Sequence, residues 1–233
     1  MSEVRDIRRF RRLATGAAMI ATAPFVLASV AIKPADDGSA GAVMADLASH
    51  ASAMEASLML GLIAIALLIP ATLGLMRIAQ EGSPMLALIG GGLTLLGWVA
   101  FMGMQALGAV ALVMAGSHDR AVMTNLYDQI GNSNVITVIQ TGFIVGHVVG
   151  IAILGVAVAR SRVAPIWIGI VLVVSGPLHF VAHGIDIQAL DLAAFALLVL
   201  GYAAGGVILL RMKNDSSENV PSQTRTVAAV PAI

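Results

Sequence analysis

Long apolar runs alternate with short polar segments along most of this chain. A helix needs about 20 apolar residues to cross the hydrocarbon core of a bilayer, which is about 30 Å thick. Membrane-spanning strands would instead alternate polar and apolar residues. Six apolar runs reach about this length or exceed it, at residues 13–32, 56–76, 84–115, 135–159, 164–182 and 192–210. The pattern therefore predicts an all-α fold, a polytopic membrane bundle of six transmembrane helices.

The composition agrees with a bilayer environment. Hydrophobic residues make up 58% of the chain and charged residues only 11%, against about 25% charged residues in soluble domains. The absence of cysteine excludes disulfides, thiolate metal sites and cysteine nucleophiles. The six runs contain no lysine for a Schiff base, and no glycine-rich loop carries the lysine of a phosphate-binding motif. We therefore expect the lipid bilayer as a partner and no nucleic acid.

Basic residues predict the orientation of the bundle, because they accumulate in short cytoplasmic segments. If the six helices alternate in direction, eleven of the 13 basic residues fall on one side. Five arginines precede the first run, and only Lys33 and Arg120 fall on the other side. Both termini are therefore predicted to be cytoplasmic, in a multi-pass protein of the plasma membrane, which in bacteria is the cytoplasmic membrane.

Acidic residues and histidines show the opposite distribution. Eight of the 13 acidic residues lie on the predicted outer side, which leaves that side with a net charge of −6. This excess is in part the complement of the positive-inside bias; the alternative is that it attracts cations toward the outer mouth of the bundle. None of the five histidines lies on the arginine-rich side. No topology rule requires that, so chemistry is best sought in the outer half.

The ends of the chain are predicted to differ from the transmembrane domain at residues 13–211. Residues 1–12 form a basic cytoplasmic N-terminus. Residues 212–233 lose apolar periodicity and gain Ser, Asn, Gln, Thr and Pro, which is typical of a disordered cytoplasmic tail. The arginine-rich start, the apolar run and the small residues Ser29 and Ala31 also match a cleavable signal peptide. Cleavage would leave the topology of the other five helices unchanged.

Two segments on the predicted outer side are expected to be amphipathic helices. Between residues 42 and 69 there is no proline and only one glycine, so the second helix is predicted to continue outward past the lipid, with an amphipathic segment near residues 40–55. Near residues 118–131, Val122, Leu126 and Ile130 recur every four residues. This spacing predicts a short amphipathic helix on the outer surface.

Glycines in the fourth run indicate close helix packing. Gly142, Gly146 and Gly150 are four residues apart, which places three positions without side chains on one helix face. A neighbouring backbone can approach such a face closely. The sequence leaves open whether the partner is another helix of this chain, a second copy in a homo-oligomer or another membrane protein.

Polar side chains within the apolar runs are the first candidates for function, since polar groups at membrane depth usually face the bundle interior or a wet cavity. Gln140 and His147 are seven residues apart, so they share one face of the fourth helix and point away from its glycines. One interpretation is structural, with His147 donating a hydrogen bond to a neighbouring helix, for example to Gln105 of the third. The other is a polar stripe that responds to protons.

The fifth run contains the most suggestive cluster of side chains. Ser175, His179 and His183 recur every four residues, and Asp186 follows on the same line. Pro177 frees a backbone carbonyl and should kink the helix beside the histidines. Two histidines four residues apart on one helix can hold one metal ion such as zinc. The alternative is a hydrated, hydrogen-bonded rim.

A metal site needs a third or fourth ligand. Asp46 and His50 repeat the four-residue spacing in the second helix. If the second and fifth helices adjoin, His179, His183, His50 and Asp46 form a candidate metal site at the outer membrane boundary. A haem held by His147 and His179 is less favoured, because the two residues should differ in depth by about 10 Å at a rise of about 1.5 Å per residue.

Ser175, His179 and His183 also resemble a motif of the intramembrane metal hydrolases related to alkaline ceramidases. The resemblance covers residues 175–183. It implies seven spans, a separate serine–histidine pair and an intramembrane aspartate on earlier helices. Here six runs are present, and both the pair and an intramembrane aspartate are missing. The chain is therefore not assigned to that family.

Three functions fit these patterns. The first is a small permease, or an accessory or interaction subunit, with a polar, histidine-containing outer half. The alternative is an outer-facing metal-binding protein, in one form a metal-dependent membrane hydrolase whose metal polarises a bound water. A haem redox protein comes third. The sequence alone specifies neither a substrate nor a catalytic residue.

Overall fold

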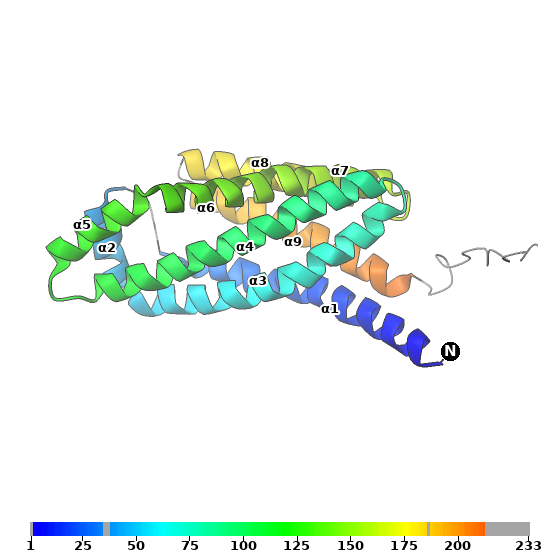
Figure 1. The fold of residues 1–233 in the computed structure, drawn as a ribbon, viewed down its shortest axis with the longest axis horizontal. Coiled ribbons are helices and arrows are strands. Elements are labelled where there is room, and N and C mark those ends of the chain that lie inside the picture. Colours follow the sequence, from blue (N-terminus) through cyan, green and yellow to red (C-terminus); the bar gives the residue numbers. More distant parts are fainter. Residues whose placement is uncertain (1, 35–37, 186, 213–233) are drawn as a thin grey trace, which may run out of the picture.

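The computed structural model describes residues 2–34, 38–185 and 187–212. Six helices in these ranges are long and apolar enough to cross a membrane. They lie side by side in one elongated bundle (Figure 1), which confirms the predicted polytopic membrane fold. The start of the first helix and the end of the last lie at the same end of the bundle (Figure 1). We call this the terminal end and the opposite one the distal end.

The helices follow the predicted runs and extend beyond most of them. The membrane-spanning elements are α1 (Ser2–Ile32), α3 (Ala51–Gln80), α4 (Pro84–Ala115), α8 (Ile166–Ile185), α9 (Gln188–Arg211) and a composite of α6 (Asn134–Ile144), the π-helix η1 (Val145–Gly150) and α7 (Ile151–Arg160). Two short helices, α2 (Ala40–Ser49) and α5 (Arg120–Gly131), lie at the distal end (Figure 1). The predicted basic segment at residues 1–12 is, from Ser2 on, a continuation of α1. The predicted disordered tail falls, from residue 213 on, outside the described residues.

Side-chain caps explain where three of these helices begin. Ser39, Asp119 and Ser133 each accept a hydrogen bond from the backbone N–H three residues later, at the starts of α2, α5 and α6. Such caps satisfy backbone donors that have no partner within the helix. Pro84 begins α4, where its missing N–H costs nothing.

The second helix does not continue outward without a break, and that prediction was wrong. α2 ends at Ser49 and α3 begins at Ala51, with His50 between them at φ −119° and ψ 32°. The break allows α2 to fold over the distal end of α4, where Val43 and Leu47 become buried in an apolar cluster with Met114. Each such side chain contributes about 1.5–3 kcal/mol when buried. His50 is neither glycine nor proline, so the local pattern contains no sign of the break.

A helix, α5, occupies the second predicted outer segment but packs through a different face. Val122 and Leu126, two residues of the predicted stripe, are 55% and 42% exposed. Met123 and Tyr127 instead pack against the cluster between α2 and α4. Met123 and Tyr127 each follow a residue of the predicted stripe, so the two faces are adjacent on the helix. Packing against α2 and α4 determines which of the two faces is buried.

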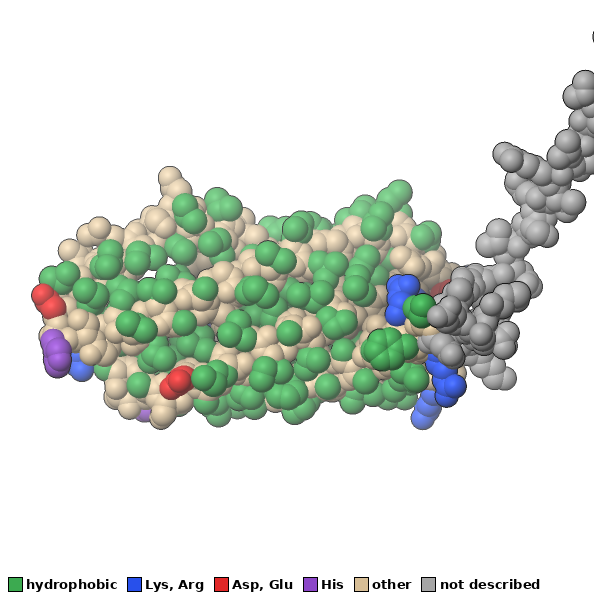
Figure 2. Space-filling model, turned by 60° about the horizontal axis from the view of Figure 1, so that its bottom comes forward, with side chains coloured by type: hydrophobic (Ala, Val, Ile, Leu, Met, Phe, Trp, Pro, Cys, Tyr) green, Lys and Arg blue, Asp and Glu red, His purple; other side chains and the backbone are tan. Residues whose placement is uncertain are grey.

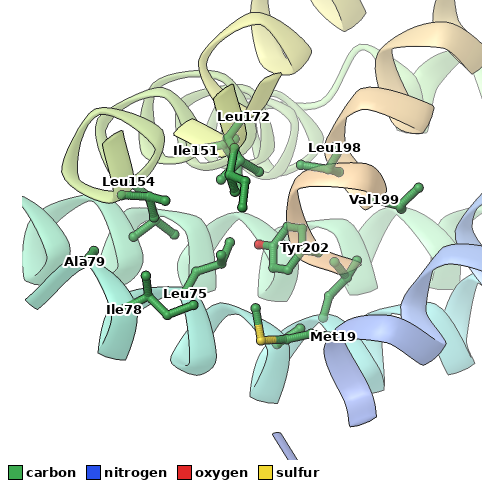
Figure 3. Packing of buried hydrophobic residues seen from close by; sticks show 14 of the residues in the cluster. Met19, Leu75, Ile78, Ala79, Ile151, Leu154, Leu172, Leu198, Val199 and Tyr202 are labelled. Carbon is green, nitrogen blue, oxygen red and sulfur yellow. The ribbon is translucent and has the colours of Figure 1, made fainter. Parts of the chain in front are cut away.

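The main hydrophobic core lies toward the terminal end. Buried side chains from α1, α3, α7, α8 and α9 meet there, among them Met19, Leu75, Ile151, Leu172 and Leu198, each completely buried (Figure 3). Small residues on the surrounding helices allow the backbones to approach each other closely around these side chains. This core closes the bundle across its terminal half.

A polar cluster is buried within this core. Thr72 Oγ1 donates to the Leu68 carbonyl at 2.8 Å, lies 2.9 Å from the Tyr202 hydroxyl and accepts from Trp98 Nε1 at 3.1 Å. Because the single proton of Thr72 goes to Leu68, Tyr202 donates to Thr72. One hydroxyl oxygen thus joins α3, α4 and α9.

Thr72→Val is expected to lower the free energy of unfolding by about 2–4 kcal/mol, because it removes the buried acceptor that Trp98 Nε1 and the Tyr202 hydroxyl share. Thr22→Val is the matched control. Thr22 is equally buried, but its hydroxyl donates only to the Ala18 carbonyl of its own helix, at 2.8 Å. Thermal unfolding in one detergent compares the two variants. Equal melting temperatures would show that the shared hydroxyl does not stabilise the bundle.

Candidate functional site

A cavity of about 520 Å³ lies in the distal half of the bundle. Ligand pockets in proteins usually measure about 300–1,000 Å³. All six membrane-spanning elements contribute to its wall. The polar residues of the wall are Ser29, Lys33, Ser57, Gln105, Gln140, His147, His179, His183, Gln188 and Asp191.

His147 forms part of the floor of the cavity. The π-helix η1 carries it, and its side chain is only 2% exposed. Its ring stacks on Phe143, with centroids 5.2 Å apart and an interplanar angle of 18°, and meets Trp98 edge-on at 5.5 Å. Nδ1 is buried and has no hydrogen-bond partner in the described part of the chain. A π-helical turn that carries a polar residue is frequent at functional sites.

His179 and Asp191 form the central polar pair of the site. His179 Nδ1 is hydrogen-bonded to Asp191 Oδ1, in the first turn of α9. The side chains are 18% and 27% exposed. An ionised carboxylate only accepts hydrogen bonds, so Nδ1 carries the proton and donates it, which leaves Nε2 for another partner. Phe195 packs against the His179 ring at 4.8 Å.

His147 and His179 lie next to each other, and the predicted difference in depth was wrong. Their ring centroids are 4.9 Å apart at an interplanar angle of 83°. The prediction measures each residue from the outer end of its own apolar run, as though the two outer ends lay at one depth. The fourth span has 27 residues and the fifth 20, and a short connection joins them at the terminal end, so their distal ends are staggered. Rings in edge contact leave no gap for a haem plane between them.

Two of the other predicted polar residues line the cavity, and the third is buried in the bundle away from it. Gln105 lines the cavity, but its Nε2 donates to the Leu58 carbonyl at 3.5 Å rather than meeting His147. Gln140 also lines the cavity and is exposed. Ser175 does not line it; its side chain is buried and donates to the Leu172 carbonyl at 2.8 Å.

The four residues of the predicted metal site fall in two places. His179 and His183 both line the cavity, with ring centroids 6.5 Å apart. Asp46 and His50 bind each other at 3.0 Å outside the cavity wall, and the His50 side chain is 57% exposed. Within residues 2–34, 38–185 and 187–212, no group of three or more His, Asp or Glu residues could hold a metal ion. Asp186 lies outside those ranges, and a zinc site remains a prediction.

The glycines of the fourth span lie against α4 of the same chain. A Cβ atom on Gly146 would come within 2.4 Å of the Gly97 Cα, and one on Gly150 within 2.7 Å of the Thr94 nitrogen. Gly142 has more room, with Ala100 Cβ at 3.6 Å. This face is therefore occupied within the chain, and the contact holds η1 and His147 in position.

Asp191 is the main site residue that sequence reasoning missed. Its place just before the sixth apolar run predicts an outer-surface acid and no intramembrane aspartate. It lies instead in the first turn of α9, within the candidate membrane span Gln188–Arg211. A signal was present: a short connection joins the fifth and sixth runs, so His179 and a residue twelve positions later can lie at the same depth.

Comparison with known proteins gives a family and no activity. A family model described as a domain of unknown function matches residues 14–211, which include nearly all of the membrane-spanning bundle. No curated protein and no solved structure matches the chain.

Proposed function

Because the chain belongs to the DUF4386 family, for which no function is assigned, we propose a function from its cavity: a small permease that binds its solute in the distal half of the bundle. The observation that carries this proposal is the cavity of about 520 Å³, with the His179–Asp191 pair in its wall. Polar groups at membrane depth are costly and usually serve a wet or ligand-filled space.

The closed terminal half supports a transport cycle. Ile151 and Leu198 lie about one turn deeper than His147 and Phe195 and are completely buried in the core. A binding site near the middle of a bundle, open on one side and sealed on the other, is one state of an alternating-access transporter. Transport would require this core to open.

The π-helix η1 is the element most suited to such a movement. If the π-helical turn became α-helical, the residues on one side of it would rotate about the helix axis relative to those on the other side. Gln140 and Phe143 of α6, which line the cavity wall, would rotate in this way. Gly97 and Gly146 let η1 and α4 touch through their backbones, so no large side chain blocks sliding at that point.

Side-specific cysteine labelling tests the permease function, since the natural chain contains no cysteine. Met104→Cys places a thiol in the cavity wall. In proteoliposomes, a charged, membrane-impermeant methanethiosulfonate should modify it quickly from the distal side and more slowly from the terminal side. Ser175→Cys is the control, because Ser175 is 1% exposed and does not line the cavity.

The outcome of this labelling separates the candidate functions. Modification from both sides supports the permease. Modification from the distal side alone contradicts transport and favours an accessory subunit that binds a ligand. Failure of Met104→Cys to react from either side contradicts both functions, since the cavity would then be closed to solutes.

The orientation of the bundle belongs to the same proposal. Basic side chains gather near the terminal end (Figure 2), where Arg77 and Arg160 lie in the last turns of α3 and α7. Positive charge is retained on the cytoplasmic side. A reporter fused after Arg162 is therefore expected to show cytoplasmic activity in a bacterial plasma membrane. A periplasmic signal from this fusion would reverse the assigned orientation.

A further inference from the structure

A gap in helix packing lies in the cavity wall, between α6 and α8. Deeper in the bundle η1 and α7 pack against α8, but within the described chain α6 has no extensive packing with α8. The cavity wall along this gap includes Ile144 of α6 and Phe180 of α8, which are 41% and 56% exposed. The fourth and fifth spans thus separate on the distal side of η1.

The outer surfaces of the two helices on either side of this gap are apolar. Val138 and Val145 of the fourth span are 71% and 40% exposed, Val174 and Val181 of α8 are 44% and 49% exposed, and none of the four lines the cavity. Such surfaces face lipid in a membrane bundle. The gap therefore connects the cavity with the hydrocarbon phase, and a ligand that dissolves in the membrane can reach it without crossing water.

The inner wall combines apolar and polar side chains. Met54, Leu58 and Met104 line it from α3 and α4, which also contribute Ser57 and Gln105, and the His179–Asp191 pair lines it from α8 and α9. An apolar wall favours an alkyl or ring body, and a few placed polar groups fix the orientation of a ligand. The cavity is thus shaped for an amphiphile.

The polar pair also indicates which head group fits. The Asp191 carboxylate accepts a hydrogen bond from Nδ1–H of His179, so Nε2 of the neutral imidazole offers a lone pair, which a hydrogen-bond donor on the ligand can use. The Asp191 carboxylate, 27% exposed, repels an anionic head group in this poorly screened site. Lys33 in the same wall is already engaged in an interaction of its own. A neutral hydroxyl satisfies both conditions.

We infer that the cavity binds a neutral, membrane-dissolved amphiphile with a hydroxyl head group, which enters between α6 and α8 and donates its hydrogen bond to His179 Nε2. This inference rests on the proposed binding function of the cavity and adds the ligand class and its route. Long-chain alcohols are the simplest compounds of that class.

Photocrosslinking with a diazirine-bearing hexadecanol tests the inference in liposomes of neutral phospholipid. Crosslinks are expected on α6 and α8 peptides that line the cavity, and unlabelled hexadecanol should compete. Palmitate at alkaline pH should compete poorly because it is an anion, and butanol should compete poorly because it lacks the apolar body. Palmitate competing as well as hexadecanol would overturn the choice of head group.

Ile144→Trp tests the lateral route, because it enlarges a side chain at the gap. Crosslinking should fall roughly tenfold, which corresponds to about 1.4 kcal/mol. Val138→Trp is the matched control, since Val138 lies on the same helix, is exposed and does not line the cavity. Equal crosslinking in the two variants would overturn the lateral entry.

Different experimental results would contradict the proposed ligand class and the proposed permease function. If hexadecanol does not crosslink while Met104→Cys reacts from both sides, the permease stands and the amphiphile is wrong. If hexadecanol crosslinks while Met104→Cys reacts from the distal side alone, the ligand class stands and transport is wrong.

Discussion

Gly146→Ala is expected to destabilise the bundle by about 1–3 kcal/mol, the usual cost of forcing an added methyl group into a packed interior. The new Cβ would lie 2.4 Å from the Gly97 Cα and 2.6 Å from the Leu93 carbonyl oxygen. Both are backbone atoms, which cannot swing aside as a side chain can. The variant must therefore push η1 away from α4, and His147 moves with η1.

Gly142→Ala is the control within the same glycine series. Its Cβ would make an ordinary contact with Ala100 Cβ at 3.6 Å, and alanine favours the helix by up to about 1 kcal/mol over glycine. Thermal unfolding in one detergent should show a melting temperature several degrees lower for Gly146→Ala, since 1 kcal/mol corresponds to about 2–4 °C for a chain of this size. Equal melting temperatures for the two variants would contradict the close backbone contact.

His179→Phe is expected to weaken hexadecanol binding roughly tenfold to a hundredfold, because one hydrogen bond to a charged or polarised group contributes about 1.5–3 kcal/mol. Phenylalanine keeps an aromatic ring beside Phe143, His147 and Phe195. It removes both nitrogens and leaves the Asp191 carboxylate without its donor. A loss of binding with little loss of stability would therefore come from the nitrogens and not from packing.

Asp191→Asn should weaken binding less than His179→Phe, since the amide oxygen still accepts from Nδ1. The double variant should lose no more than His179→Phe alone, because both residues act through Nε2 and their effects are not additive. His50→Phe provides the control. His50 pairs with Asp46 at 3.0 Å in the same chemical way, but outside the cavity wall. Equal effects of His50→Phe and His179→Phe on crosslinking would contradict the role of His179.

Several features of the fold could be predicted from local pattern. The apolar runs located the six membrane-spanning elements, because a bilayer of about 30 Å imposes a helix length that appears directly as an apolar run. The glycine spacing in the fourth span marked a close backbone contact, since a four-residue interval places glycines on one helix face whatever surrounds it. The histidines lie on the side opposite the arginines in the predicted topology, and three of them line the cavity.

Other features depended on distant residues. The break at His50 follows from the burial of α2 side chains against α4, which the α2 sequence does not reveal. The π-helix η1 arises inside an uninterrupted apolar run, where an α-helix is the default. The shared hydroxyl of Thr72 joins residues from three helices, and no spacing along the chain connects them.

The sequence by itself determined that this is a six-span membrane protein and which ends of its helices carry the arginines and which the acids. Both follow from the preference of each residue for lipid or water, which acts locally. Only the tertiary structure decided that His147 meets His179, that Asp191 and not Asp46 is the carboxylate beside the cavity, and that α6 and α8 separate beyond η1. These contacts depend on the relative depth and rotation of helices, which are set by backbone packing between segments far apart in the chain.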